Sequence, residues 1–365
     1  MSISNQKGNT NLPTRFSNGA DFLLFVASLR MLFMDPLIVS VSNRTPASVL
    51  SDGVSHKSCA NRPIRRPLVT ILLATFNGAL WLDEQLQSIV CQTGVDVSVV
   101  ASDDSSTDAT MQRLADWSTR VRLQVLPQPD RRFGSAHRNF LRLICDAPLG
   151  NAEYVALADQ DDIWLDGKLE RAVQCLHDLG SDTYSSNVTA FWPDGRRLLI
   201  NKSQPQCAHD FLFGSPGPGC TFVMPRQVFD QMREWVRVGL DQMQGIWVHD
   251  WLIYAYVRSR GLSWHIDNWP SLLYRQHGNN EIGVNSGWRA TLRRWRHLRS
   301  GKYRRDILAI AEAVGDISPP VSAVRRLALA DRLWLILQVR HFRRRSRECL
   351  VLAFFFLLMP GDRNA

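Results

Sequence analysis

Three aspartates follow directly on a short apolar segment in the stretch ALADQDDIW, residues 156–164. The apolar run Tyr154–Ala158 predicts a buried strand, and Asp159, Asp161 and Asp162 come at its end. Carboxylates this close in sequence repel one another unless a positive charge lies among them, and oxygen-rich groups of this kind suit Mg²⁺ or Mn²⁺. For this stretch taken alone, a polar turn with Asp at capping positions is the alternative interpretation.

Between residues 67 and 180, apolar runs alternate with segments of helical spacing. The predicted strands are Leu68–Ala74, Val95–Ala101, Val121–Leu126 and Tyr154–Ala158, and the predicted helices are residues 82–90, 107–117, 135–145 and 166–177. This alternation predicts an α/β fold with a mostly parallel sheet flanked by helices.

In such sheets ligands bind at the carboxyl ends of the strands. The polar residues that follow the predicted strands should therefore meet along one edge, and they are Thr75, Asn77, Asp103 and Asp159–Asp162. Asp103 can accept a hydrogen bond from a nucleotide base or from a ribose hydroxyl. Asp162 is expected to support the loop that leads to Trp164.

The second half of the chain has less regular spacing, from Thr183 to Val223, and includes the turn-rich loop Gly214–Cys220. Beyond it, residues 230–238 and 248–259 are predicted helices, and residues 264–274 are predicted to be extended. Asp250 stands at the start of the second of these helices, between His249 and Trp251, as a general base or as a helix N-cap. His277 lies in RQHGNNEIG, as a ligand to a metal or phosphate or as part of a solvated loop.

Composition and motifs exclude several classes of protein. Hydrophobic residues make up 45% of the 365 residues and charged residues 21%, as in a globular protein. The seven cysteines form no CxxC pair, which favours a reducing compartment over a disulfide framework. P-loop, HExxH and GxSxG patterns are all absent, so P-loop hydrolysis, zinc-protease and α/β-hydrolase chemistry lack their usual sequence signals.

The net charge of +9 is concentrated near the C-terminus, where residues 289–347 contain sixteen Lys and Arg against four Asp and Glu. The basic stretch Arg340–Arg347 is followed at once by the apolar stretch Cys349–Met359. Basic residues next to apolar ones are typical of a helix that lies on an anionic membrane surface. A solvated basic helix that packs on the core is the alternative.

Four sequence blocks carry a family resemblance. VTILLATFNGALWLDEQLQSI, SDDSSTD, FGSAHRNF and YVALADQDDIW occur in the order and at the separations seen in glycosyltransferase family 2, which this chain resembles over about residues 67–285. HDWLIYAYV and YRQHGNNEIG resemble a subset of that family, rhamnosyltransferase-like members that act on bacterial surface polysaccharides.

The resemblance implies a GT-A fold and an inverting transfer from a nucleoside-diphosphate sugar, with a divalent metal, Mg²⁺ or Mn²⁺, as cofactor. By position, Thr75 and Asn77 would line the nucleotide site and Asp103 would bind the base. Asp159 and Asp161 would hold the metal and the diphosphate, Asp250 would be the catalytic base, and His277 would approach the diphosphate or the metal.

The resemblance also implies a partner and a location. The acceptor would be a hydroxyl of a saccharide or lipid-linked molecule in cell-surface polysaccharide synthesis, with L-rhamnose, a hexose or an N-acetylhexosamine as the sugar. We expect the protein at the cytoplasmic face of the cell membrane, with no nucleic acid as partner. A non-catalytic protein that binds a nucleotide sugar or nucleic acid is the rival class.

The expected organisation has three parts. Residues 1–65 are expected to form a poorly ordered arm, residues 66–287 the GT-A domain, and residues 288–365 a basic helical extension that contacts the membrane.

Overall fold

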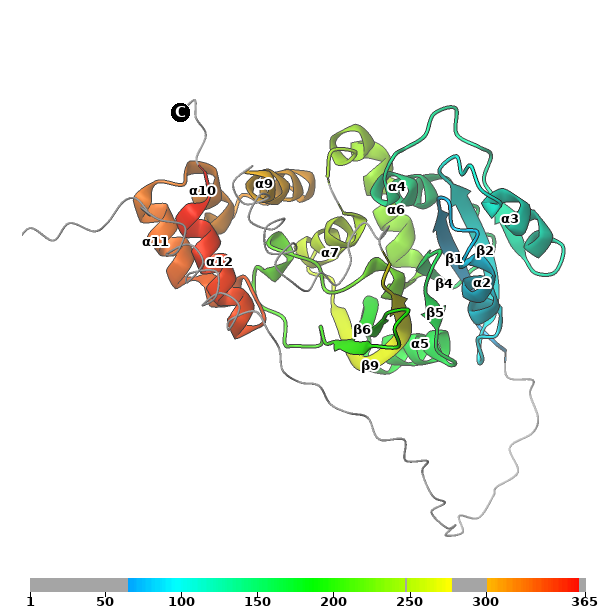
Figure 1. Cartoon of the computed structure of the whole chain (residues 1–365). Helices are drawn as coiled ribbons and strands as arrows, with labels where there is room; N and C mark the ends of the chain where they lie inside the picture. Colours follow the sequence, from blue (N-terminus) through cyan, green and yellow to red (C-terminus); the bar gives the residue numbers. More distant parts are fainter. Residues whose placement is uncertain (1–64, 247, 278–300, 361–365) are drawn as a thin grey trace, which may run out of the picture. The chain divides into compact units, whose positions relative to one another are not determined.

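The computed structural model describes residues 65–246, 248–277 and 301–360, coloured in Figure 1. The predicted arm, residues 1–65, lies outside this range except for its last residue. The strands are β1 Leu68–Thr75, β2 Asp96–Asp103, β3 Leu123–Val125, β4 Tyr154–Asp159, β5 Ile163–Trp164, β6 Thr183–Phe191, β7 Arg197–Ile200, β8 Val223–Pro225 and β9 Trp264–Arg275. The helices are α2 Leu82–Val90, α3 Thr110–Ser118, α4 Ala136–Asp146, α5 Lys168–Leu179, α6 Arg226–Met243, α7 His249–Ser259, α9 Lys302–Val314, α10 Pro319–Arg326, α11 Leu329–Leu337 and α12 Ser346–Leu358, with short 3₁₀ turns η1 Asp210–Leu212, η2 Gly219–Thr221 and η3 Val339–His341.

The strands form one mixed sheet in the order β3-β2-β1-β4-β8-β6-β9-β5, with β7 paired to β6. The first half is parallel, since β1 pairs with β2 and β4, and β2 pairs with β3. The predicted mostly parallel α/β sheet is thus confirmed for this half. Beyond β4, the strand β8 runs antiparallel to both of its neighbours, and β6 pairs with β9 in parallel.

Alternate residues of the central strands face two different cores. Leu72 and Leu157 belong to a core with α4, α6 and α7, whereas Ile71 and Ala156 belong to the opposite core with α2 and α5. This alternation follows from the two-residue repeat of a strand. The helices in Figure 1 therefore cover both faces of the sheet. This leaves the carboxyl ends of the strands as the place where a ligand can bind.

Strand β6 falls in the stretch for which the sequence predicts only irregular structure, so that expectation is wrong. Its residues are almost all buried, yet Ser185, Ser186 and Asn187 are polar and give no hydrophobic signal. Tertiary contacts satisfy these groups, because Trp264 Nε1 donates to Ser185 Oγ at 2.8 Å and the Ser186 and Ser271 hydroxyls lie 2.6 Å apart.

The helices after residue 301 pack on the sheet domain through an aromatic cluster. Phe213, which follows η1, stacks on Phe342 with ring centroids 4.5 Å apart, and Phe356 of α12 meets Phe213 edge-on at 5.8 Å. The predicted Arg-rich helices are present in the described part of the extension, and residues 288–300 lie outside the description. Across the described ranges, none of the helices combines the length and the apolar character needed to cross a membrane.

Candidate active site

The ends of β1, β2 and β4 lie side by side, as predicted. Thr75 is in register with Asp103, and Ala74 is in register with Asp159. The Thr75 hydroxyl donates to Asp103 Oδ2 at 2.8 Å, and both side chains are about 1% exposed. Parallel pairing therefore brings three of the predicted site residues to one edge of the sheet.

Asp103 and Asn77 organise the loops at this edge. Asp103 Oδ1 accepts from the Ser106 amide at 2.8 Å, and its Oδ2 accepts from the Ser106 hydroxyl at 2.6 Å. Asn77 has a left-handed backbone, φ +47°, and its Oδ1 accepts from the Thr107 amide at 2.8 Å. The Asn77–Thr107 bond joins the loop after β1 to the loop after β2, and the Asp103–Ser106 bonds hold the second loop in place.

A second connection joins the loop after β1 to the loop after β4. Gln160 Oε1 accepts from the Phe76 amide at 2.7 Å, and Gln160 Nε2 donates to the Phe76 carbonyl at 2.8 Å. Gly78 is needed beside this pair, because a β-carbon there would lie 2.2 Å from Gln160 Oε1. The residue between the predicted metal ligands thus fixes the position of their loop.

The acidic turn contains one carboxylate that is deeply buried. Asp162 is 1% exposed, its Oδ1 accepts from the Arg275 amide at 3.3 Å, and its carboxylate also interacts with the Cys220 thiol. Burial raises the pKa of Asp162 well above its ordinary value, and the charges of Asp161 and Asp159 raise this pKa further.

Lys168 is a buried basic residue close to the carboxylates of the acidic turn. It is fully buried at the first position of α5, its Nζ donates to the Cys220 carbonyl at 2.9 Å, and it lies 3.1 Å from the Trp164 ring centroid. Burial lowers the pKa of Lys168 to about 7, and the charges of Asp162 and Asp159 oppose that shift. Lys168 is not among the site residues predicted from the sequence. The available signal was its place in the buried stripe of α5, at helical spacing before Ala172 and Leu176.

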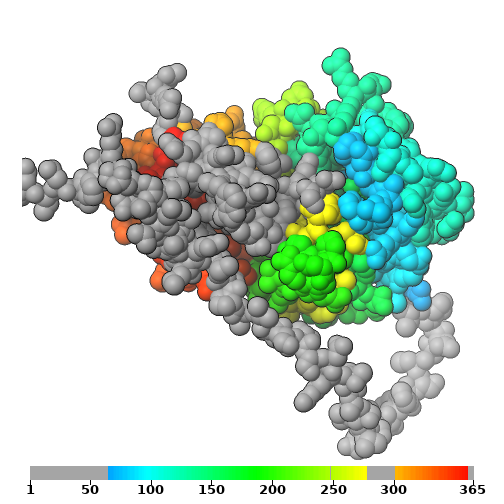
Figure 2. Space-filling view, viewed as in Figure 1, coloured from blue at the N-terminus to red at the C-terminus, as the bar shows by residue number. Residues whose placement is uncertain are grey.

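His277, which follows β9, contacts Asp161 of the acidic turn. His277 Nε2 lies 2.6 Å from Asp161 Oδ2, and the imidazole stacks on Trp81 with centroids 4.1 Å apart. Arg275 holds the same backbone, since its Nε donates to the Asp161 carbonyl at 2.8 Å. In Figure 2 the yellow surface of the β9 region adjoins the blue surface near β1, consistent with the Trp81–His277 stack.

Asp250 lies in the first turn of α7 and is half-buried. Its Oδ1 accepts from the Trp251 amide at 2.6 Å, and burial raises its pKa to about 6. The neighbouring His249 stacks on Phe140 at 4.0 Å, and burial lowers the pKa of His249 to about 3. Asp250 is therefore a carboxylate that ionises just below neutral pH, as a general base requires.

The loop Gly214–Cys220 connects the two groups of acids. At one end, Cys220 lies with Asp159 and Asp162 in a group whose possible ligand atoms are all within 4.8 Å of one another. Next to Cys220, a β-carbon on Gly219 would lie 2.3 Å from His249 Nε2. At the other end, Ser215 lowers the pKa of Asp250, and its hydroxyl donates to the Gly217 carbonyl at 3.2 Å. One short loop thus spans from the acidic turn to the candidate base.

The acidic turn fits a hard divalent cation. Three carboxylates lie together, and the charges of Asp161 and Asp159 raise the pKa of the buried Asp162, as expected where a compensating cation would be bound. Burial and the nearby aspartates raise the pKa of the Cys220 thiol well above its ordinary value, so Cys220 stays protonated and offers little to a hard ion.

Polar strand ends side by side, an acidic turn beside them and a separate candidate base fit a sugar-transferring enzyme of the GT-A class. The family model described as Glycosyl transferase family 2 matches residues 70–225. The chain is 40% identical over 248 residues to the dTDP-rhamnosyl transferase RfbG of Shigella flexneri, with 67% of this chain and 86% of that protein covered.

Two further similarities have lower coverage or identity. The chain is 32% identical over 137 residues, 37% of each protein, to the succinoglycan biosynthesis protein ExoO of Rhizobium meliloti (strain 1021). Among solved structures, that of S. aureus TarS 1–349 in complex with UDP has a TM-score of 0.48 at 14% identity, with 78% of this chain and 82% of that chain covered.

The chain belongs to glycosyltransferase family 2. It is an inverting glycosyltransferase whose donor is a nucleotide sugar.

Proposed function

We propose that this enzyme transfers L-rhamnose from dTDP-L-rhamnose to a hydroxyl of a saccharide or lipid-linked acceptor in cell-surface polysaccharide synthesis. The observation that carries this proposal is the 40% identity to a dTDP-rhamnosyl transferase over 86% of that protein. A hexose or N-acetylhexosamine donor is the alternative on the same fold. Hydrolysis of dTDP-rhamnose, UDP-glucose and UDP-N-acetylglucosamine by the purified protein decides between them, and preference for a UDP-sugar would overturn the rhamnosyl assignment.

In this proposal the strand ends hold the donor nucleotide. Thr75 and Asn77 line the nucleotide site, and Asp103 receives the base. The support is the network in which Asp103 is fixed by Thr75 and by the loop after β2, so that its position is set before the donor arrives. Preorganised groups of this kind reduce the entropy lost on binding.

Asp159 and Asp161 are the proposed metal ligands, with His277 as the residue that orients Asp161. A bound Mg²⁺ or Mn²⁺ would neutralise charge on the departing nucleoside diphosphate. Asp162 is the structural acid of the turn, since it is buried and accepts from the Arg275 amide. We expect Asp161→Asn to weaken Mn²⁺-dependent donor binding. If Asp162→Asn has the larger effect on Mn²⁺ affinity, the ligand assignment is wrong.

Asp250 is the proposed catalytic base, which takes the proton from the acceptor hydroxyl as that oxygen attacks the anomeric carbon. Its half-buried position and its pKa of about 6 support this role. Asp250→Asn should lower turnover by roughly 10²–10⁴, because a positioned base contributes about that factor. Donor binding, measured by calorimetry with dTDP, should be unchanged in this variant, and an equal loss of donor affinity would sink the assignment.

We also propose that the transferase domain spans residues 66–287 and that the extension, residues 288–365, rests on the membrane surface. The extension exposes a set of leucines on α11 and α12, namely Leu329, Leu333, Leu337, Leu350 and Leu357, which are 53–80% exposed. Arg340, between the two helices in sequence, and Arg347, in the first turn of α12, are also exposed. Exposed apolar residues next to basic ones favour contact with an anionic leaflet.

A further inference from the structure

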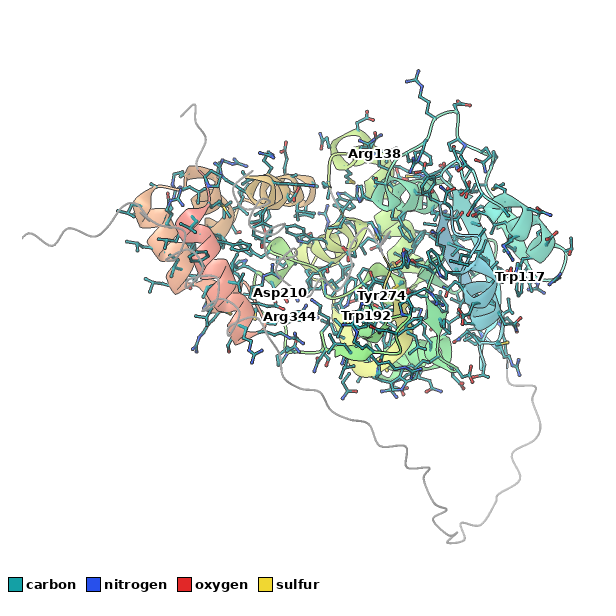
Figure 3. All side chains as sticks on the ribbon, in the orientation of Figure 1. Trp117, Arg138, Trp192, Asp210, Tyr274 and Arg344 are labelled. Atoms are coloured by element: carbon teal, nitrogen blue, oxygen red, sulfur yellow. The ribbon has the colours of Figure 1, made fainter. Side chains whose placement is uncertain are left out.

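The C-terminal extension brings a run of arginines to the neighbourhood of Asp250. Arg344 is only 8% exposed, and its Nε lies 3.4 Å from Asp210 Oδ2. Its Nη1 donates to the Lys202 carbonyl at 3.0 Å, and its Nη2 donates to the Ser215 carbonyl at 3.1 Å. Figure 3 shows Asp210 and Arg344 next to each other. One buried guanidinium therefore joins two loops, one of which carries Ser215, a residue that lowers the pKa of Asp250.

Lys202 is held in place but its ammonium is available. The Lys202 amide donates to Asn187 Oδ1 at 2.6 Å, and its stem lies against Gly217, with Lys202 Cγ 3.6 Å from where a β-carbon there would be. Within the described ranges the Lys202 ammonium forms no hydrogen bond, although its charge acts on Asp250 and lowers the pKa of that base. A fixed backbone with an unoccupied ammonium is what a ligand-binding lysine needs.

Around Lys202 and Arg344, basic side chains outnumber carboxylates. Arg344 shares Asp210 with Arg258, whose Nη1 lies 3.4 Å from Asp210 Oδ1. Arg343 forms an ion pair with Glu348 at 3.7 Å, and the charge of Asp210 also acts on it. Arg345 donates to the Asn201 carbonyl and has no carboxylate partner in the described part of the chain.

Lys202, Arg343, Arg344 and Arg345 together form a basic cluster. Burial and the charges of the three arginines lower the pKa of Lys202, against the opposing effect of Glu348. Like charges in a partly buried place repel one another unless an anion lies among them. An anion is therefore expected in the basic cluster, just as a cation is expected among the carboxylates of the acidic turn.

We propose that the basic cluster is a binding subsite for a phosphate or diphosphate group carried by the acceptor, with Lys202 as the residue that contacts it. The proposal rests on the assignment of Asp250 as the base, because the subsite serves the substrate whose hydroxyl Asp250 activates. The donor diphosphate belongs at the acidic turn, at the other end of the loop Gly214–Cys220. Membrane headgroups are disfavoured, since Arg344 is buried and Lys202 is half-buried, out of reach of a flat surface.

The test is calorimetric binding of inorganic diphosphate to the full-length protein in EDTA, so that no metal site competes. The wild type should bind one diphosphate, and Lys202→Met should weaken this binding at least tenfold. Lys202→Arg should retain it, because the positive charge is kept. Arg340→Met, an exposed arginine of the same extension, is the matched control and should bind as the wild type does. Thermal melting of each variant shows whether it is folded.

Three results would overturn the subsite: equal affinity in folded Lys202→Met, displacement of the diphosphate by dTDP, or displacement by phosphatidylglycerol vesicles. The second would assign the diphosphate to the donor site, and the third would assign the cluster to lipid headgroups. Because calorimetry needs no turnover, Asp250→Asn protein should bind diphosphate at least as tightly as the wild type. If Asp250→Asn keeps full activity, Asp250 is not the catalytic base. The diphosphate-binding measurements would still decide whether the subsite exists.

Discussion

His277 Nε2 and Asp161 Oδ2 lie 2.6 Å apart, although the two residues are separated by 116 positions in the chain. The contact joins the end of β9 to the turn after β4, and the imidazole is fixed from the other side by its stack on Trp81. An imidazole that orients a carboxylate next to a metal site acts on that metal without touching it.

Replacement of His277 by Ala should therefore weaken Mn²⁺ binding by about 10–100-fold, the usual cost of losing a group that orients a metal ligand. Titration of the protein with Mn²⁺ in the presence of dTDP measures this. His177→Ala is the control, because its side chain is 82% exposed and lies on α5. An unchanged Mn²⁺ affinity in His277→Ala would count against the proposed role.

The pH dependence of turnover should report Asp250. Burial raises its pKa to about 6, and a base acts only when it is ionised, so the rate should be lost as pH falls through about 6. We expect a decrease of about tenfold for each pH unit below that value, with the donor saturating. Lys202→Met should move this acid limb to higher pH, because it removes a cation that lowers the pKa of Asp250. An acid limb that persists in the residual activity of Asp250→Asn would assign it to another group.

Substitution of Gly78 by Ala should loosen the loop after β1. The new β-carbon would displace Gln160, which forms two hydrogen bonds with the Phe76 backbone. Their loss should lower the free energy of unfolding by about 1–3 kcal/mol, measured by urea denaturation. Gly245→Ala is the matched control, because nothing lies within 4 Å of a β-carbon there. Equal effects of the two substitutions would refute the packing argument.

The exposed leucines of the extension should govern binding to membranes. The double change Leu333→Asp and Leu337→Asp places two charges on the apolar face of α11, and we expect vesicle binding to fall at least tenfold. Sedimentation with phosphatidylglycerol vesicles measures this. Leu199→Asp, on the 52% exposed leucine of β7, is the control and should have no effect. Retained binding in the double variant would assign membrane contact to another part of the chain, or remove it.

Local sequence patterns were sufficient to identify the parallel half of the sheet. The predicted helix over residues 82–90 is observed as Leu82–Val90, and the runs at Leu68 and Tyr154 are observed as β1 and β4. Continuous apolar runs and helical spacing are local signals, and parallel pairing then brings the residues after those strands to one edge. Thr75, Asp103 and Asp159 could be placed together for this reason alone.

The tertiary structure determined which buried polar and charged side chains surround those residues. Strand β6 is buried through hydrogen bonds to distant side chains, so its polar sequence carries no strand signal. Lys168 falls in the apolar stripe of α5, but only packing shows that it is buried beside Asp162. The ion pair between Arg344 and Asp210 joins residues that no local pattern relates. Sequence thus determined which residue types stand at the strand ends, whereas long-range burial and charge pairing determined which side chains pack around the acidic turn and how Arg344 of the extension joins Asp210 and the loop at Ser215.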